Sequence, residues 1–257
     1  MRNAAFVAIL AAAAVPVALA QTKWRQVSSF TVAWDNHANV RFALSIPATW
    51  NDPGDFTRIS IRVPGRKQVV LTNDEGWVKY RSAEASASQQ IKKSKNLIAS
   101  DYLFAGSVAA NRTVLFLFGY SYASSPGSLD IVEISGDGDV RVVLHRSEFG
   151  LRDFHDLDGD GIGEVVGYPC LSQPWGNGLL TYDPFNVYKL SHVPAGPATL
   201  SIPLSKTYNL QNYYGWVGPK CSEDFAVVLH PPKGGKPVVL PAKEAERMME
   251  STGNARH

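Results

Sequence analysis

Alternation of apolar and polar residues dominates the chain and predicts β-strands. Ser28–Trp34 and Val40–Ile46 alternate with a period of two, at which successive side chains of a strand point to opposite faces. Apolar runs bounded by turn residues predict ten further strands: Thr57–Val63, Gln68–Thr72, Leu97–Val108, Thr113–Tyr122, Leu129–Ile134, Val140–His145, Gly163–Tyr168, Phe185–Leu190, Asp224–His230 and Val238–Leu240. The pattern therefore predicts an all-β protein.

One segment near the C-terminus has the composition of a helix. Lys243–Ser251 contains no Gly, Pro or β-branched residue, and it is the only segment that we expect to be helical. Ala83–Lys95 is rich in Ser, Ala and Lys, and it fits either a helix or a loop. We expect a single β-rich domain over residues 21–257 with a short C-terminal helix.

Composition and charge indicate a globular protein and argue against a nucleic-acid partner. The 257 residues are 45% hydrophobic and 19% charged, which is typical of a globular protein. The formal net charge is +2 with acids and bases interspersed, so no basic stripe marks a nucleic-acid partner. The six histidines show no zinc-site spacing, and neither a nucleophile elbow nor a phosphate loop occurs.

The first 20 residues have the form of a signal peptide. Arg2 precedes the apolar run Ala4–Val15, and Ala18-Leu19-Ala20 has the small-x-small form of a cleavage site. The run is shorter than the roughly 20 residues that a membrane-spanning helix needs. We expect a mature chain that begins at Gln21, has no membrane span, and is periplasmic or secreted.

Two cysteines remain in this predicted mature chain. An isolated pair in an oxidising compartment is most simply a disulfide, here between Cys170 and Cys221. The alternative is a pair of buried free thiols.

The most informative segment is the acidic loop Asp156–Glu164. Carboxylates stand at its positions 1, 3, 5 and 9, and hard oxygen ligands at alternating positions suit Ca²⁺. Gly159 and Gly161 permit the positive φ values that such coiling requires. The predicted ligands are Asp156, Asp158, Asp160, the carbonyl of Ile162, and Glu164. The nearest base along the chain is Arg152, so without a cation these carboxylates are expected to lack a neutralising partner.

The segments that flank the loop argue against a helix–loop–helix calcium site. An EF-hand needs a ligand at position 12, where this chain has Gly167, and a helix on each side. The segments before and after the loop are instead short and β-like. The sequence therefore predicts a calcium site in a loop between two strands.

The residues Phe154–Gly161, followed by Glu164-Val165-Val166-Gly167, resemble one copy of the FG-GAP/VCBS-type repeat of integrin-like β-propellers. The resemblance covers residues 150–168 and implies that the loop joins two strands of one blade and binds Ca²⁺. It implies a propeller-like fold, few-bladed or incomplete because only one acidic loop is present. A β-sandwich that carries one calcium loop is the alternative.

Aromatic and amide residues in the second half form a candidate ligand surface. Trp175, Tyr213, Tyr214 and Trp216 offer rings for stacking on a glycan or for contact with a protein ligand, or they fill gaps between sheets. These features predict an exported calcium-binding protein that acts as a binding, adhesion or structural module, with no catalytic constellation in the sequence. The alternative is an extracytoplasmic hydrolase of envelope or extracellular polymers with a structural calcium.

Overall fold

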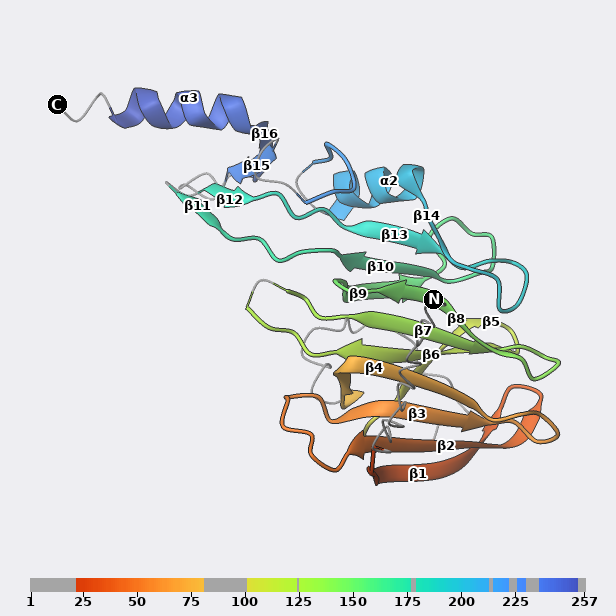
Figure 1. Ribbon diagram of the computed structural model, residues 1–257. Coiled ribbons are helices and arrows are strands. Elements are labelled where there is room, and N and C mark those ends of the chain that lie inside the picture. Colours follow the sequence, from red (N-terminus) through yellow and green to blue (C-terminus); the bar gives the residue numbers. More distant parts are fainter. Residues whose placement is uncertain are drawn as a thin grey trace, which may run out of the picture.

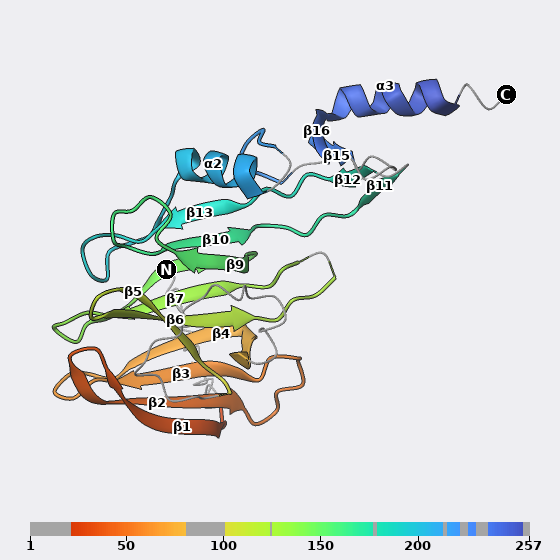
Figure 2. The same ribbon diagram turned by 180° about the vertical axis from the view of Figure 1, so that it is seen from behind.

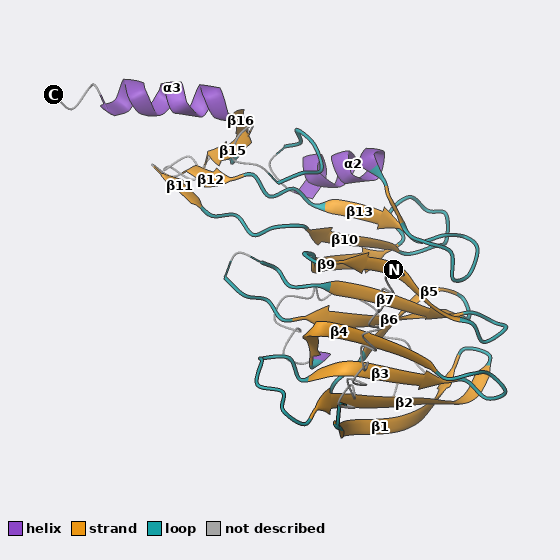
Figure 3. Ribbon diagram, in the orientation of Figure 1, coloured by secondary structure: helices purple, strands orange, loops and turns teal. Residues whose placement is uncertain are grey.

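The computed structural model describes residues 22–80, 101–123, 125–176, 179–212, 215–221, 226–229 and 236–253. Most of these residues belong to antiparallel strands, so the predicted all-β class is confirmed (Figure 3). The predicted signal peptide and the undecided segment Ala83–Lys95 lie outside the described residues.

The strands form one eight-stranded and two four-stranded antiparallel sheets, which we divide into four units of four strands. Unit 1 consists of β1 (Trp24–Trp34), β2 (His37–Pro47), β3 (Phe56–Arg62) and β4 (Val69–Val78). Unit 2 consists of β5 (Phe104–Ala109), β6 (Arg112–Gly119), β7 (Leu129–Ile134) and β8 (Val140–Arg146). Units 1 and 2 are the two halves of the eight-stranded sheet, joined by the pairing of β4 with β6. Unit 3 consists of β9 (Gly150–His155), β10 (Glu164–Tyr168), β13 (Asn186–Lys189) and β14 (Thr199–Leu200). Unit 4 consists of β11 (Pro174–Gly176), β12 (Leu179–Thr181), β15 (Ala226–Leu229) and β16 (Val238–Pro241).

Units 1, 2 and 3 follow one another along the molecule, with the helix α2 (Ile202–Asn212) beyond unit 3 (Figures 1 and 2). Strand β6 of unit 2 is apolar on both faces. Val114, Phe116 and Phe118 belong to the core shared with unit 3, whereas Leu115 and Leu117 belong to the core shared with unit 1. Burial on both sides explains why this strand is a continuous apolar run in the sequence.

Unit 4 interleaves with unit 3 rather than following it. Strands β11 and β12 lie in the connection between β10 and β13, and β15 and β16 complete unit 4 after α2. Among the residues that the structure describes, no apolar cluster joins unit 1 to unit 4. Ring closure of a propeller is therefore not observed.

The helix α2 corrects the expectation that only Lys243–Ser251 is helical. Two buried polar residues hold α2 against unit 3: Ser205 Oγ accepts a hydrogen bond from Val187 N at 2.9 Å, and Asn209 exchanges two with the backbone of Phe185. Leu204 and Tyr208 add apolar contacts with unit 3, but the two polar residues also lie on the buried side, so the segment has no continuous apolar stripe. Ser201 at its start and Pro203 in its first turn were the available helix signals.

The C-terminal helix prediction is confirmed by α3 (Ala242–Gly253), which packs Ala245 against Leu179 and Val227 of unit 4. Strand β7 coincides with its predicted range, while β5 begins later than predicted, at Phe104. No helix among the described residues has the length and apolar character that a membrane crossing requires.

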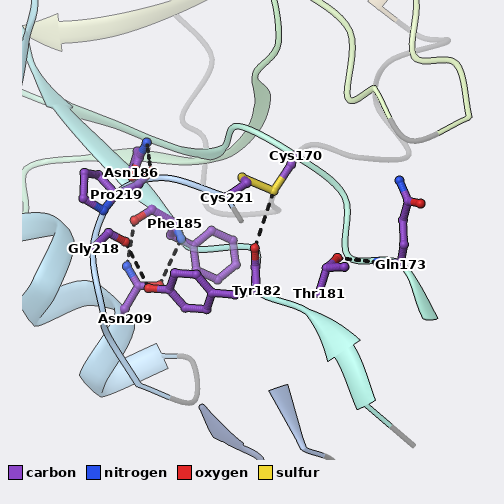
Figure 4. The surroundings of a disulfide bond; sticks show 10 residues. All are labelled: Cys170, Gln173, Thr181, Tyr182, Phe185, Asn186, Asn209, Gly218, Pro219 and Cys221. Atoms are coloured by element: carbon purple, nitrogen blue, oxygen red, sulfur yellow. Dashed lines mark hydrogen bonds between the residues drawn. A yellow bond between two sulfur atoms is a disulfide. The ribbon is translucent and has the colours of Figure 1, made fainter. Parts of the chain in front are cut away.

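The predicted disulfide is present between Cys170 and Cys221, with Cα atoms 6.3 Å apart (Figure 4). The loop before Cys221 is also held by hydrogen bonds. Buried Tyr182 donates its hydroxyl to Gly218 O at 3.1 Å, and Asn186 donates to Pro219 O at 3.0 Å. The bridge thus joins the end of unit 3 to a loop that unit 3 already binds.

Removal of this disulfide is expected to destabilise the protein. The bridge closes a sequence separation of 51 residues, for which loop-closure entropy gives about 4 kcal/mol before strain. We expect the double variant Cys170→Ala/Cys221→Ala to lose about 2–4 kcal/mol in urea unfolding. Dithiothreitol should lower wild-type stability by a similar amount and leave the double variant unchanged. A loss below about 1 kcal/mol would contradict a stabilising role.

Candidate metal centre

The acidic loop joins β9 to β10, so the predicted strand–loop–strand arrangement is confirmed. Gly159 and Gly161 have φ values of 78° and 84°, as coiling of the loop requires. Phe154 is buried at the base of the loop, against Phe116 of β6. At the other end, Gly163 N donates to Val108 O at 2.9 Å, which fixes the loop against the β5–β6 hairpin.

Backbone amides coil the loop around its first carboxylate. Asp156 accepts hydrogen bonds from Gly159 N at 2.7 Å and from Gly161 N at 2.9 Å. The Asp160 carboxylate accepts one from Ile162 N at 2.9 Å. These local bonds depend only on residue spacing within the loop, which is why the sequence is sufficient to predict its form.

Glu164 is the one fully buried carboxylate among the four acidic residues of the loop. Its Oε2 accepts a hydrogen bond from Leu157 N at 2.7 Å, whereas its Oε1 is buried without a hydrogen-bond partner. Burial raises the pKa of Glu164 from the usual 4.5 to about 7, and the nearby Asp158 and Asp160 add to the rise. An unpaired buried carboxylate oxygen is unfavourable unless a cation or a proton satisfies it.

The side chains of Asp156, Asp158 and Glu164 converge. One ligand oxygen from each lies within 4.8 Å of the others, which is compatible with a metal ion that bridges them. Asp160 stands outside this group, and its Oδ2 lies 2.8 Å from Lys189 Nζ and 3.2 Å from His192 Nε2. The structure therefore brings three of the four predicted carboxylate ligands together, and the roles of Asp160 and the Ile162 carbonyl stay predictions.

Lys189 corrects the expectation that no base neutralises the loop. Its Nζ lies 2.5 Å from Asp158 Oδ2, and it also pairs with Asp160. These two hydrogen bonds raise the pKa of Lys189, and the bond from Lys189 lowers the pKa of Asp160. Lys189 is distant in sequence but lies directly opposite Glu164 in the β10–β13 pairing, so only the strand register reveals it.

The predicted aromatic surface is only partly within the described residues. Trp175 packs against the apolar cluster of Leu179, Val227 and Ala245. Trp216 is half-buried in the loop before Cys221, and Tyr213 and Tyr214 lie outside the described residues. The shared ligand surface therefore stays a prediction.

The fold and the site define an all-β protein with an acidic strand–loop–strand centre. Comparison with protein-family models, with curated proteins and with solved structures gives no match to this chain.

Proposed function

We propose that the protein is an exported calcium-binding β module, in which one Ca²⁺ bound by the acidic loop stabilises unit 3. The observation that carries the proposal is the buried, unpartnered Oε1 of Glu164 beside the carboxylates of Asp156 and Asp158. A bound cation would satisfy this oxygen and offset the repulsion among the three carboxylates.

The donor set favours Ca²⁺ among common metals. All three converging groups are hard carboxylate oxygens, with no cysteine or histidine among them. A loop that binds through alternating residues adapts to the six to eight ligands of Ca²⁺ more readily than to the strict octahedron of Mg²⁺. Lys189 must then release Asp158, and its flexible side chain is free to do so because it is partly exposed.

Two further observations support the resemblance to the FG-GAP/VCBS-type repeat and the proposed export. The acidic loop joins two adjacent strands of one four-stranded unit, as that resemblance implies. The modular, disulfide-linked architecture is compatible with export. We propose that the four units are arranged as in an incomplete propeller. A crystal structure in which the units share no common axis would reject this arrangement.

Calcium dependence of stability tests the metal proposal. At about 100 times the dissociation constant, Ca²⁺ is expected to add about 2.7 kcal/mol to the free energy of unfolding. Differential scanning calorimetry with Ca²⁺ or with EGTA measures this, and isothermal titration compares Ca²⁺ with Mg²⁺. We expect Asp158→Asn to remove the effect and Asp139→Asn, in the acidic β7–β8 turn, to retain it. An unchanged melting temperature in EGTA would reject a structural calcium.

A second candidate is an extracytoplasmic hydrolase of envelope or extracellular polymers. It is favoured by a histidine and two carboxylates that line one cavity, namely His155, Asp153 and Asp156. We rank it second because both carboxylates already accept backbone hydrogen bonds, Asp153 from Phe154 N and Asp156 from the acidic loop. Release of reducing ends from a polysaccharide by the wild type, and not by Asp153→Asn, would reverse this order.

A further inference from the structure

A polar cavity separates β9 from α2 and borders the acidic loop. Its volume is about 460 Å³, within the range of about 300–1,000 Å³ typical of small-molecule sites. We call it the α2 pocket and define it by six of its lining residues: Arg152, Asp153, His155, Tyr208, Thr207 and Gln211. It lies on the side of unit 3 that faces α2.

A β-bulge in β9 aims two of these side chains into the pocket. In the pairing with β10, Asp153 lies opposite Val166 but Leu151 lies opposite Gly167, so Arg152 is an extra residue. The bulge lets Leu151 and Phe154 both face the core, and it turns Asp153 and His155 to the pocket side. Gly167 is required there, because a side chain would collide with the backbone of Gly150.

Asp153 and His155 lie side by side at the edge of the pocket, and Asp153 accepts a hydrogen bond from Phe154 N at 2.8 Å. His155 Nδ1 lies 3.1 Å from Asp153 Oδ1, but the geometry is not that of a hydrogen bond, and the nitrogen is buried without such a partner. Asp153 is itself buried. A ligand hydroxyl, which both donates and accepts, suits the accessible part of the His155 imidazole, since 39% of this side chain is exposed and it lines the pocket.

The rest of the pocket combines donors, acceptors and rings. Arg152 supplies donors, while exposed Thr207 and Gln211 supply groups of both kinds from α2. The rings of Phe185 and Tyr208, 5.5 Å apart and edge to face, form an apolar wall. The charged residues that line the pocket are one arginine, Arg152, and two aspartates, Asp153 and Asp156, which disfavours a polyanionic ligand such as a polyphosphate.

We propose that the α2 pocket binds a neutral saccharide, whose hydroxyl groups pair with the Asp153–His155 edge and with Thr207 and Gln211. The ring faces of a sugar are apolar and suit the wall of Phe185 and Tyr208. This inference rests on the proposed binding-module function and names its ligand class. It does not require the calcium ion to contact the sugar.

The test measures sugar binding and calcium binding separately on the same mature protein. The probes are glucose, galactose, N-acetylglucosamine and their β-linked disaccharides, with inorganic phosphate as the anion control. Saturation-transfer NMR detects binding, and isothermal titration gives the dissociation constant. The pocket variant is Thr207→Ala/Gln211→Ala, and the matched control is Lys206→Ala/Leu210→Ala, because all four residues are exposed on α2.

At least one saccharide is expected to bind with a dissociation constant of about 1 mM or lower. The pocket variant should weaken it about tenfold through two lost hydrogen bonds, while the control stays within about twofold. Calcium affinity should be equal in all three proteins. Absence of binding by every saccharide, equal weakening in the control, or binding of phosphate in place of sugars would each overturn the inference. In all three cases the calcium proposal is tested independently by the calcium titration.

Discussion

The variant Glu164→Gln is expected to be more stable than the wild type in EGTA and less stable in saturating Ca²⁺. Glutamine keeps the shape of Glu164 but carries no charge, so it removes the unfavourable burial of a carboxylate with one unpaired oxygen. The same change removes an anionic ligand from the group formed with Asp156 and Asp158. Calcium-dependent stabilisation should therefore be lost.

The pH dependence in EGTA follows from the raised pKa of Glu164. Its value in the folded protein, about 7, lies above the ordinary 4.5, so the folded state holds this proton more tightly than the unfolded chain. The contribution of Glu164 to stability is fully present below pH about 4.5 and is lost as pH rises through about 7. At pH 8 the wild type should be about 2–3 kcal/mol less stable than Glu164→Gln.

Urea unfolding between pH 4 and pH 8, in EGTA and in Ca²⁺, measures both effects. Glu148→Gln is the matched control, because Glu148 is exposed and outside the loop. Wild-type stability that stays flat across this range in EGTA would contradict the buried charge. Equal calcium stabilisation of Glu164→Gln and the wild type would exclude Glu164 as a ligand.

The variant Arg112→Met is expected to lose about 3–5 kcal/mol of unfolding free energy. Arg112 binds both carboxylate oxygens of Glu133, at 2.5 and 2.9 Å, and donates to Ser191 O at 2.6 Å. Only 1% of the Glu133 side chain is exposed. Methionine fills much of the space of arginine but leaves the carboxylate of Glu133 buried without its cation.

Two further variants separate this buried charge from lost packing. Arg112→Met/Glu133→Gln should recover part of the loss, because it removes the unpaired charge and keeps the packing change. Arg141→Met should lose less than about 1 kcal/mol, since the Arg141–Asp139 pair is exposed on both sides. Urea denaturation of the four proteins provides the comparison. A double variant no more stable than Arg112→Met would assign the loss to packing instead.

The strands and the acidic loop are predictable because their signals are local. The alternation of apolar and polar residues in Val40–Ile46 appears in the structure as alternating buried and more exposed residues along β2. The loop coils through hydrogen bonds between residues at most seven positions apart, such as Gly161 N to Asp156 and Leu157 N to Glu164. The disulfide was predictable for a different reason, since Cys170 and Cys221 leave only one pairing.

The helix α2 escaped prediction because its stability is not local. Its hydrogen bonds to unit 3 are made by Ser205 and Asn209, and its apolar contacts by Leu204 and Tyr208. These contacts form only after the two segments meet. Apolar periodicity, the usual signal of an amphipathic helix, is absent from such a segment. The α2 pocket was equally hidden, since it needs both the helix and the bulge at Arg152.

The sequence by itself determined that the chain is β-rich, that its two cysteines pair, and that nine consecutive residues form a coiled acidic loop. Only the tertiary structure decided which charges meet. Strand register places Lys189 opposite Glu164, and the packing of unit 3 buries the Glu164 carboxylate beside Asp158. Spacing along a chain fixes contacts within a loop, whereas pairing between distant strands fixes the electrostatic environment of that loop.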